Sequence, residues 1–441
     1  MKKTLLGLVV VLCMFSCKNS DEYKPFLHNP DLFSATVHEL NSVVMGNNFP
    51  PMVASRNYAY AAIAAYEVIA AAYPNQYQSL GGQLNGLTTV HAPALTPDVD
   101  VELAALLAYM KVGESVTFPE GSMQAYADSI LKVARQKGLT DKIEKASRLY
   151  ADSIGREIVR WSKKDNYLET RGAEKYTVKD IPGRWVPTPP MYASAAEPHW
   201  MEIRTMVIDS AGIFDPVPPP AFNIKDKNSK YYQEVMAIKN AVDSLTPEQR
   251  HIAEFWDDNP FKMNVTGHVM YSSKKFSPGG HWMSVVGIAA QQSKADYSTT
   301  VYATAKTAIA LFDAFIQCWY VKYKHNTVRP ETVINKYIDI NWRPYLQTPA
   351  FPEYTCGHST ISSSAAEALT SVFGDNFAYT DSTELEFGIK SRSFKSFRHA
   401  AEENNWARFY GGLHYHNSCI ISTDIGQKVG RLVATRLKMK K

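Results

Sequence analysis

The sequence predicts an all-α protein whose helical bundles are joined by a proline-rich connecting segment. Most long segments repeat apolar residues at the three- and four-residue spacing of a buried helix face. Alternating patterns typical of strands are short and scarce, and there is no internal repeat or low-complexity tract. Of the 441 residues, 45% are hydrophobic and 20% are charged, which is the composition of a globular chain. The length fits one large domain or two ordinary ones.

The N-terminus has the pattern of an export signal. Lys2 and Lys3 precede an apolar run, Thr4–Met14, that is too short to span a membrane comfortably. A serine and then Cys17 follow, as at the end of a bacterial lipoprotein signal. We therefore expect residues 1–16 to be removed and Cys17 to carry the lipid, which makes the chain a cell-envelope lipoprotein on the periplasmic or surface face. The alternative is an ordinary secretory signal with a chance cysteine.

Residues 17–220 are predicted to form an N-terminal helical region that ends in a proline-rich arm. An alanine-rich segment closed by Pro74 and three amphipathic segments predict helices over Ser55–Tyr73, Val101–Val112, Met123–Lys137 and Asp141–Lys164. Between residues 167 and 223 nine prolines forbid long helices. Trp185 and Trp200 in this segment indicate an ordered arm that packs on the body.

Residues 221–441 are predicted to form a second, more regular helical domain. The apolar periodicity resumes after the prolines, and the glycine of Gly374-Asp375 ends one of the helices. The predicted helices are Ser229–Ser244, Pro247–Trp256, His281–Gln292, Ser298–Lys324, one from His358 to residue 373, Phe394–Glu403, Trp406–Tyr410 and Ser418–Lys438.

Charge and cysteine content exclude two classes of protein. The 47 basic and 43 acidic residues leave a net charge of +4, which gives no electrostatic reason to expect a nucleic acid partner. Beyond the signal only Cys318, Cys356 and Cys419 remain, so a disulfide scaffold is excluded, although one pair is possible.

Three short segments carry residue types that bind an oxyanion. They are KYKHNTVRP from Lys322, FPEYTCGHS from Phe351 and RFYGGLH from Arg408. Two guanidinium groups and an ammonium group can neutralise an oxyanion, and a glycine at a helix N-terminus can offer its backbone N–H. Histidines in the second and third segments can supply an axial ligand or nucleophile and a general acid.

The order and spacing of these segments resemble the signature of the type 2 phosphatidic acid phosphatase and vanadium haloperoxidase superfamily. That signature is K-x6-R-P, then P-S-G-H, then S-R-x5-H-x3-D, and the similarity covers roughly Phe255 to Lys438. Trp319 and Phe351 resemble the aromatic wall of the pocket in the bacterial haloperoxidase-like branch. The segments Phe255–Asp258 and Pro278–Trp282 resemble that branch as well. The resemblance implies an all-helical fold with two four-helix bundles around the pocket.

The resemblance also implies roles for single residues. Lys322, Arg329 and Arg408 would hold the equatorial oxygens of vanadate or phosphate, and the Gly357 N–H would donate to them. His414 would be the axial vanadium ligand, or the nucleophile of a phosphatase. The other roles implied are acid–base catalysis by His358, a pocket wall of Trp319 and Phe351, an oxyanion contact from Cys356, and orientation of Arg408 by Asp258.

The chain departs from the family pattern at several positions. Cys356 stands where the family has a serine, and a thiol is a weaker donor than a hydroxyl. Thr355 replaces the proline and Ala407 replaces the serine of the third motif. Ser418 stands where an aspartate orients the histidine, and the nearest downstream carboxylate is Asp424.

Three functions remain open from the sequence. The first is a haloperoxidase that oxidises halide with hydrogen peroxide at bound vanadate. The second is a phosphomonoesterase of the same superfamily, which needs no cofactor and acts on a phosphate ester through a phosphohistidine at His414. The third is a lipid-anchored protein with a degenerate anion-binding pocket.

Overall fold

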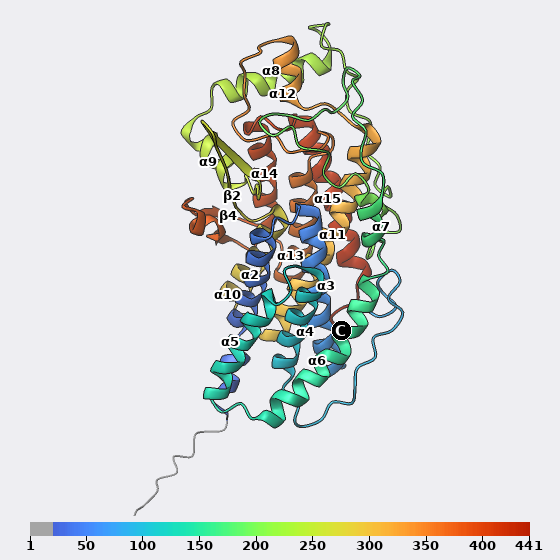
Figure 1. The fold of residues 1–441 in the computed structure, drawn as a ribbon, viewed down its shortest axis with the longest axis vertical. Helices are drawn as coiled ribbons and strands as arrows, with labels where there is room; N and C mark the ends of the chain where they lie inside the picture. Colours follow the sequence, from blue (N-terminus) through green and yellow to red (C-terminus); the bar gives the residue numbers. More distant parts are fainter. Residues whose placement is uncertain (1–20) are drawn as a thin grey trace, which may run out of the picture.

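The computed structural model describes residues 21–441, which form an elongated, predominantly helical molecule (Figure 1). The export signal and Cys17 lie outside the described residues. The helices of the first half are α1 (Tyr23–Leu27), α2 (Pro30–Gly46), α3 (Pro51–Ala72), α4 (Val101–Val116), α5 (Ser122–Gln136), α6 (Asp141–Ser162) and α7 (Tyr167–Gly172). Those of the second half are α8 (Lys230–Asp243), α9 (Pro247–Phe255), α10 (Pro278–Ser293), α11 (Tyr297–His325), α12 (Pro330–Tyr337), α13 (Gly357–Phe373), α14 (Phe397–Tyr410) and α15 (His416–Arg436). This confirms the all-α prediction.

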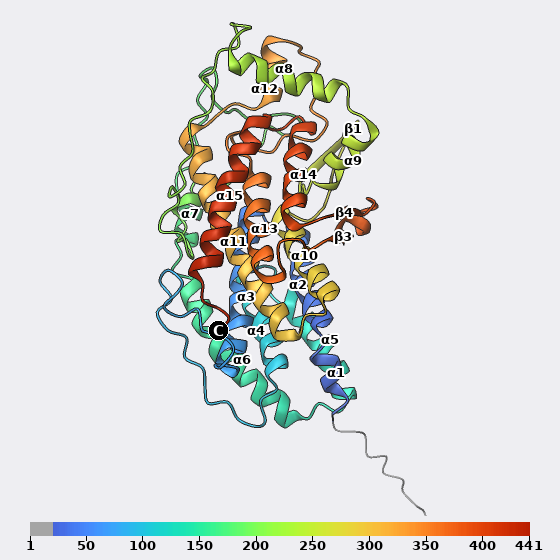
Figure 2. The same cartoon turned by 180° about the vertical axis from the view of Figure 1, so that it is seen from behind.

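The N-terminal helices α2 to α6 gather at one end of the molecule, around the buried helix α3 (Figures 1 and 2). Small alanines along α3 allow α4 and α11 to pack closely on it. The helix α11 is buried along most of its length and joins the two halves, because it contacts α3 on one side and α13 on another. One continuous apolar core therefore includes buried residues from both halves of the chain, the first of them Tyr23 and the last Met439. The division at residues 220 and 221 stays a prediction.

Helices α13 and α15 approach so closely that only glycine fits between them. A Cβ atom at Gly426 would lie 2.1 Å from the carbonyl oxygen of Thr360, and one at Gly430 would lie 2.5 Å from that of Ser364. This contact holds the start of α13 against α15 and against the loop that precedes α15. The Gly357-His358 motif at the start of α13 therefore lies near the third basic segment, which ends in that loop (Figure 2).

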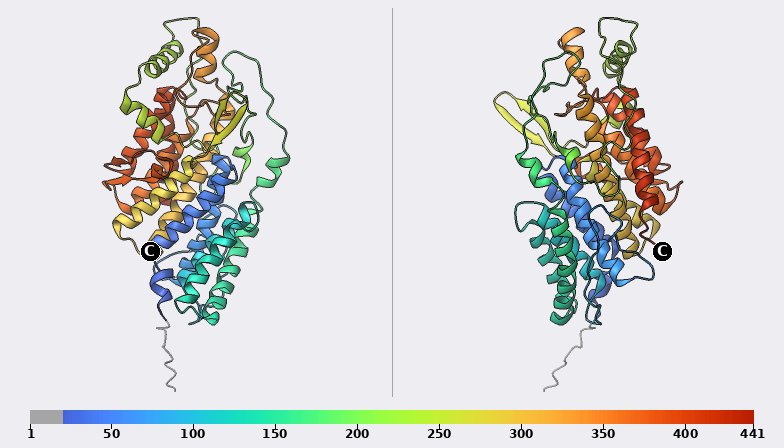
Figure 3. Two further views of the ribbon diagram at one scale, coloured as in Figure 1. Left: turned by 60° about the vertical axis from the view of Figure 1, so that its left-hand side comes forward. Right: turned by 90° about the vertical axis from the view of Figure 1, so that its right-hand side faces the viewer.

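The proline-rich segment between α7 and α8 packs on the body, as predicted (Figure 3). It contains only the short 3-10 helix η1 (Trp200–Glu202), and both Trp185 and Trp200 are fully buried. The buried carboxylate of Asp313 on α11 accepts hydrogen bonds from the backbone N–H groups of Met206, Val207 and Ile208, at 2.7, 2.7 and 3.0 Å. The arm is thus hydrogen-bonded to the central helix.

The structure differs from the sequence prediction in several elements. Helices α1, α2, α7 and α12 were not expected, and the two short helices predicted near the C-terminus form one, α14. Two antiparallel hairpins are present, β1 (Lys262–Thr266) with β2 (Val269–Ser273) and β3 (Tyr379–Asp381) with β4 (Arg392–Phe394); the 3-10 helix η2 (Thr383–Phe387) lies between β3 and β4. Among the described residues, none of the helices is long and apolar enough to cross a membrane.

Candidate active site

The three basic segments meet between the ends of four helices. Lys322 lies in the last turn of α11, Arg329 caps the start of α12, and Arg408 lies in the last turn of α14. Residues 356–358 start α13. His414 follows a tight turn in which Gly412 adopts a φ of +78° and a side chain would collide with Pro344. Helix ends and turns thus bring together groups that lie about 90 residues apart in the chain.

His414 is held by hydrogen bonds on both ring nitrogens. Its Nδ1–H donates to the carboxylate of Glu353 at 3.0 Å, and both side chains are 2% exposed. On the other side, Arg329 Nη1 donates to His414 Nε2 at 3.0 Å. A carboxylate and a guanidinium fix the tautomer in this way, with the proton on Nδ1 and a lone pair on Nε2. That lone pair is what a nucleophile or an axial ligand needs.

Glu353 supplies the carboxylate that the family pattern places four residues after His414, where this chain has Ser418. Ser418 is buried, and its hydroxyl carries no charge that could pair with His414. Asp424 is exposed and pairs with Lys428 at 2.7 Å. Glu353 lies in the segment FPEYTCGHS itself, three residues before Cys356. The only sequence signal for it was an acidic residue in an otherwise apolar and cationic site.

Arg329 is fully buried and only partly satisfied. Its Nε donates to the Phe351 carbonyl at 2.8 Å, and Nη1 also donates to the Leu413 carbonyl at 3.0 Å, but Nη2 has no hydrogen-bond partner. Burial lowers the pKa of Arg329 to about 10, so the group remains charged at neutral pH. A buried, charged N–H without a partner is costly unless an anion accepts from it.

Arg408 and His358 present two further unpartnered nitrogens. Arg408 Nη1 donates to the carbonyls of Trp256 and Asp257, at 3.0 and 3.2 Å, whereas its Nε has no partner. His358 Nε2 has none either. Burial, reinforced by the charge of Arg408, holds the pKa of His358 well below its usual value, so this imidazole is neutral at physiological pH.

Lys322 is fully buried, but its ammonium group is already engaged. It donates to the carbonyls of Pro352 and Glu353, at 2.8 and 3.1 Å, and to that of Thr355. These three bonds use all the protons of the ammonium group and hold the segment before α13 in place. Burial lowers the pKa of Lys322 to about 8, and the charge of Arg329 adds to this effect. Direct contact with an oxyanion requires Lys322 to exchange one of its carbonyl partners.

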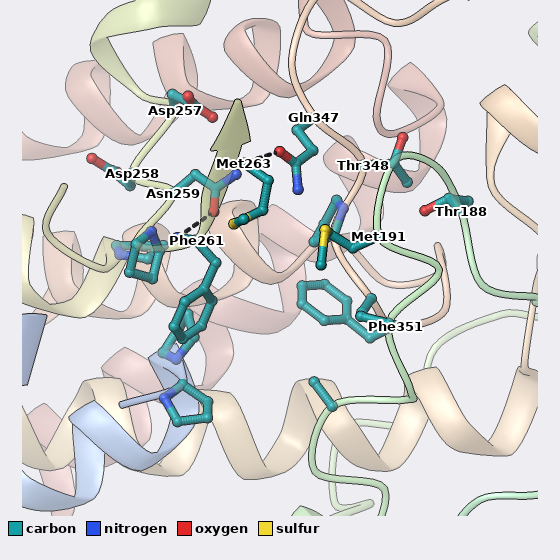
Figure 4. A pocket seen from close by; sticks show the side chains of 18 of the residues that line it. Thr188, Met191, Asp257, Asp258, Asn259, Phe261, Met263, Gln347, Thr348 and Phe351 are labelled. Atoms are coloured by element: carbon teal, nitrogen blue, oxygen red, sulfur yellow. Dashed lines mark hydrogen bonds between the residues drawn. The ribbon is translucent and has the colours of Figure 1, made fainter. Parts of the chain in front are cut away.

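A cavity of about 380 Å³ leads to the site and is bordered by His358 and Arg408. Figure 4 shows the apolar side chains of Phe261, Met263 and Phe351 facing this space. The Phe351 ring also stacks at a tilt on Trp319, with ring centroids 5.0 Å apart. Trp319 itself lies behind Phe351, outside the lining, so of the two predicted wall residues only Phe351 faces the cavity.

Cys356 and Gly357 form the start of α13. The Cys356 N–H donates to Ser422 Oγ at 2.8 Å. Burial opposes charge on the Cys356 thiol, but a hydrogen bond from the Cys419 thiol is the largest of the effects that outweigh burial and hold the pKa of Cys356 well below the usual range. A Cβ atom at Gly357 would meet only Trp319, at an ordinary 3.8 Å, so the protein itself does not require glycine there. All three described cysteines are free and buried.

Asp258 does not orient Arg408, contrary to the sequence prediction. Its carboxylate turns away and bonds to His281 Nδ1 at 2.9 Å, and the charge that Arg408 faces is that of the preceding residue, Asp257. His281 is fully buried, and its Nε2 lies 2.9 Å from Asp381. Burial disfavours the imidazolium, but the two carboxylates outweigh it and hold the pKa of His281 well above its usual value.

Comparison with known proteins gives consistent results. The family model of the VCPO second helical-bundle domain matches residues 302–341 and 337–440. A crystal structure of a bacterial vanadium-dependent iodoperoxidase is similar over 93% of this chain and 97% of that one, with 42% identity and a TM-score of 0.88. The holo and apo forms of a bacterial vanadium-dependent chloroperoxidase share the fold at 17% identity, with TM-scores of 0.65 and 0.62, over 88% of this chain and 93% and 94% of theirs. No curated protein sequence matches the chain.

Proposed function

The chain belongs to the vanadium-dependent haloperoxidases, and we propose that iodide is the halide it oxidises most efficiently. It is a haloperoxidase whose cofactor is vanadate and whose substrates are halide and peroxide. The preference for iodide is supported by the 42% identity to a protein described as an iodoperoxidase. The cavity supports it too, because a large, weakly hydrated anion loses least on entering a space walled by Phe261, Met263 and Phe351.

The buried donors fit vanadate, and this observation carries the assignment of the site. The donors Arg329 Nη2 and Arg408 Nε and the acceptor His358 Nε2 are buried without a partner, close to His414 Nε2, whose lone pair accepts from Arg329 Nη1. Arg329 and Arg408 would hold the oxygens, and His414 would bind the vanadium once Arg329 Nη1 turns from its lone pair to the anion. Lys322 would add charge, and Gly357 N–H and the Cys356 thiol would contact the oxyanion from the start of α13. Bound vanadate supplies a Lewis-acidic centre that activates peroxide toward halide.

The protein side chains manage charge and protons around that centre. Glu353 keeps the His414 proton on Nδ1, so the lone pair lies on Nε2, where it now accepts from Arg329 Nη1 and would bond to vanadium once that guanidinium turns to the anion. His358, neutral and with Nε2 free, would hold and return a proton taken from hydrogen peroxide at that nitrogen. The guanidinium groups of Arg329 and Arg408 offset the negative charge of the anion.

The test is a side-by-side assay of the purified, vanadate-stripped protein. Oxidation of iodide, bromide and chloride by hydrogen peroxide is measured with increasing vanadate, and hydrolysis of p-nitrophenyl phosphate is measured in parallel. We expect vanadate to activate halide oxidation, with kcat/KM highest for iodide. Equal or higher efficiency with bromide or chloride would refute the iodide preference. Phosphate ester hydrolysis that vanadate inhibits, without halide oxidation, would favour the phosphatase that the sequence left open.

We further propose that Cys17 anchors the protein to a membrane of the cell envelope. The support is the sequence pattern alone, an apolar run that ends in serine and cysteine. The expected result is that the full chain, expressed in a bacterium, fractionates with membranes and carries a lipid on Cys17 by mass spectrometry. A Cys17→Ser variant should lose both properties. An intact membrane association in that variant would contradict the proposal.

A further inference from the structure

Behind the oxyanion site lies a fully buried group of ionisable side chains that the proposed chemistry does not use. It consists of His281 on α10, Asp258 after α9, Asp381 at the end of β3, and Glu384 in η2. All four are 3% exposed or less. Among the described residues, the Lys275 ammonium also reaches this group, 3.5 Å from Glu384 Oε2. Three carboxylates therefore face two cations, Lys275 and the His281 imidazolium, and one negative charge is left without a partner in a dry interior. A metal ion that replaces the His281 proton would have two negative charges to balance.

Two carboxylates in this group have oxygens that accept no hydrogen bond. Neither oxygen of Glu384 accepts a hydrogen bond, and Oδ2 of Asp258 accepts none. Glu384 Oε1 faces His281 Nδ1 at 3.7 Å, and Asp258 Oδ1 lies 2.9 Å from the same nitrogen. One donor atom from each of the three side chains lies within 4.8 Å of the others. Unpaired buried acceptors are costly, so their convergence on one point indicates a missing cation.

The surroundings of His281 match those of a metal-bound histidine. Its Nε2 lies 2.9 Å from Asp381 Oδ2 and 2.9 Å from Thr383 Oγ1, and Asp381 in turn accepts from Thr383 Oγ1 and the Thr383 N–H. A histidine that binds metal through one nitrogen commonly donates its other N–H to a carboxylate in this way. Trp256 stacks on the ring at 4.7 Å and fixes its plane.

We propose that Asp258, His281 and Glu384 bind a divalent metal ion of the zinc class, at a structural site distinct from the oxyanion pocket. Bonds of about 2.1 Å to a tetrahedral ion place its ligand atoms about 3.4 Å apart. The observed separations of 2.9 and 3.7 Å lie on either side of that value. One imidazole with two carboxylates is a donor set suited to Zn²⁺, and the double charge balances the cluster.

The position of the site assigns it a role. Asp258 also borders the cavity that leads to Arg408, as Figure 4 shows. The carbonyls of Trp256 and Asp257, immediately before Asp258, accept from Arg408 Nη1. A metal ion on Asp258 therefore anchors the segment that positions Arg408.

The chain offers a matched control on its surface. His28, Asp100 and Glu102 form the other group with metal-like spacing among the described residues. There, however, Asp100 Oδ1 caps α4 by accepting from the Leu103 N–H, and Glu102 Oε1 accepts from the Tyr73 hydroxyl. Because their carboxylates already have partners, this group is not expected to bind zinc tightly.

The experiment measures metal content and thermal stability rather than activity. Purified protein is analysed by inductively coupled plasma mass spectrometry, then treated with chelator, dialysed and titrated with Zn²⁺ alone. We expect close to one zinc per chain and a rise in the thermal midpoint when zinc is returned. Glu384→Gln should lose both effects, and His28→Gln should retain both.

Two results would overturn the proposal. One is wild-type protein that neither contains zinc nor is stabilised by it, which would mean that protons neutralise the cluster. The other is a Glu384→Gln variant that still binds zinc as tightly as the wild type does. Because Glu384→Gln can also fail to fold, Co²⁺ is added to stripped wild-type protein as a second measurement. A tetrahedral Co²⁺ absorption band is expected, and its absence counts against the site.

Discussion

Replacing Glu353 by glutamine tests the most specific feature of the site, the carboxylate that holds His414. The amide of glutamine has nearly the same shape, and its oxygen can still accept from His414 Nδ1, at 3.0 Å in the wild type, and from the Tyr415 N–H, at 3.3 Å. What the substitution removes is the negative charge. His414 Nε2 then becomes a poorer electron donor, and Arg329 loses the buried charge that offsets its own.

The expected effect follows from the difference between two kinds of hydrogen bond. A bond to a charged group contributes about 1.5–3 kcal/mol and a neutral one about 0.5–1.5 kcal/mol. The difference of about 1–1.5 kcal/mol corresponds to roughly a tenfold change in affinity. Loss of a group that supports a metal ligand typically costs about 10–100-fold. We therefore expect Glu353→Gln to bind vanadate about 10–100-fold more weakly.

The assay is calorimetric titration of stripped protein with vanadate, with thermal denaturation to show that the variant is folded. Asp424→Asn is the control, since Asp424 is the nearest carboxylate after His414 in the sequence and it lies exposed beside Lys428. It should bind vanadate like the wild type. Unchanged affinity in folded Glu353→Gln, or weakened affinity in Asp424→Asn, would refute the reasoning.

Three further predictions concern the cations and the thiol. Arg329→Ala and Arg408→Ala should each weaken vanadate binding about 100-fold while the protein stays folded. Arg431 is an exposed partner of Glu367, so Arg431→Ala should bind vanadate like the wild type. Equal vanadate affinities of the wild type and the two site variants in calorimetry would contradict the site. Because burial sets the Lys322 pKa at about 8, the group is charged below that pH and neutral above it, so vanadate affinity should fall as pH rises through about 8. The fall should be smaller in Lys322→Met, and identical pH profiles would disprove the role of Lys322. Cys356→Ser should bind vanadate more tightly and retain activity longer in excess peroxide. A hydroxyl donates to the oxyanion and does not oxidise, whereas a thiol whose pKa is held low forms a thiolate that repels the anion and oxidises readily. No gain over the wild type or over Cys318→Ser would mean that Cys356 does not weaken the site.

The sequence predicted the helical fold and the meeting of the basic segments because both depend on local patterns. Apolar periodicity located most helices. A family signature indicated that five elements of the site come together, namely Lys322, Arg329, Cys356–His358, Arg408 and His414. The small residues Gly426 and Gly430 show why periodicity alone could not place α13 on α15. Their function is visible only when the carbonyl oxygens of the opposite helix are located.

The prediction failed where a partner comes from an unrelated part of the chain. Glu353 replaces a carboxylate expected after His414, and no spacing rule links residues 61 positions apart. Asp258 was assigned to Arg408 by resemblance, but its carboxylate bonds to His281, to which the sequence assigned no role. In both cases the choice depends on which buried charge lies nearest in space.

The most direct test of the site is a crystal structure of the protein soaked with orthovanadate, read from the anomalous signal of vanadium. We predict one vanadium atom bonded to His414 Nε2, with its oxygens among Arg329, Arg408 and the start of α13. Vanadium bound to another residue, or an enzyme that oxidises halide with no vanadium at His414, would contradict the account.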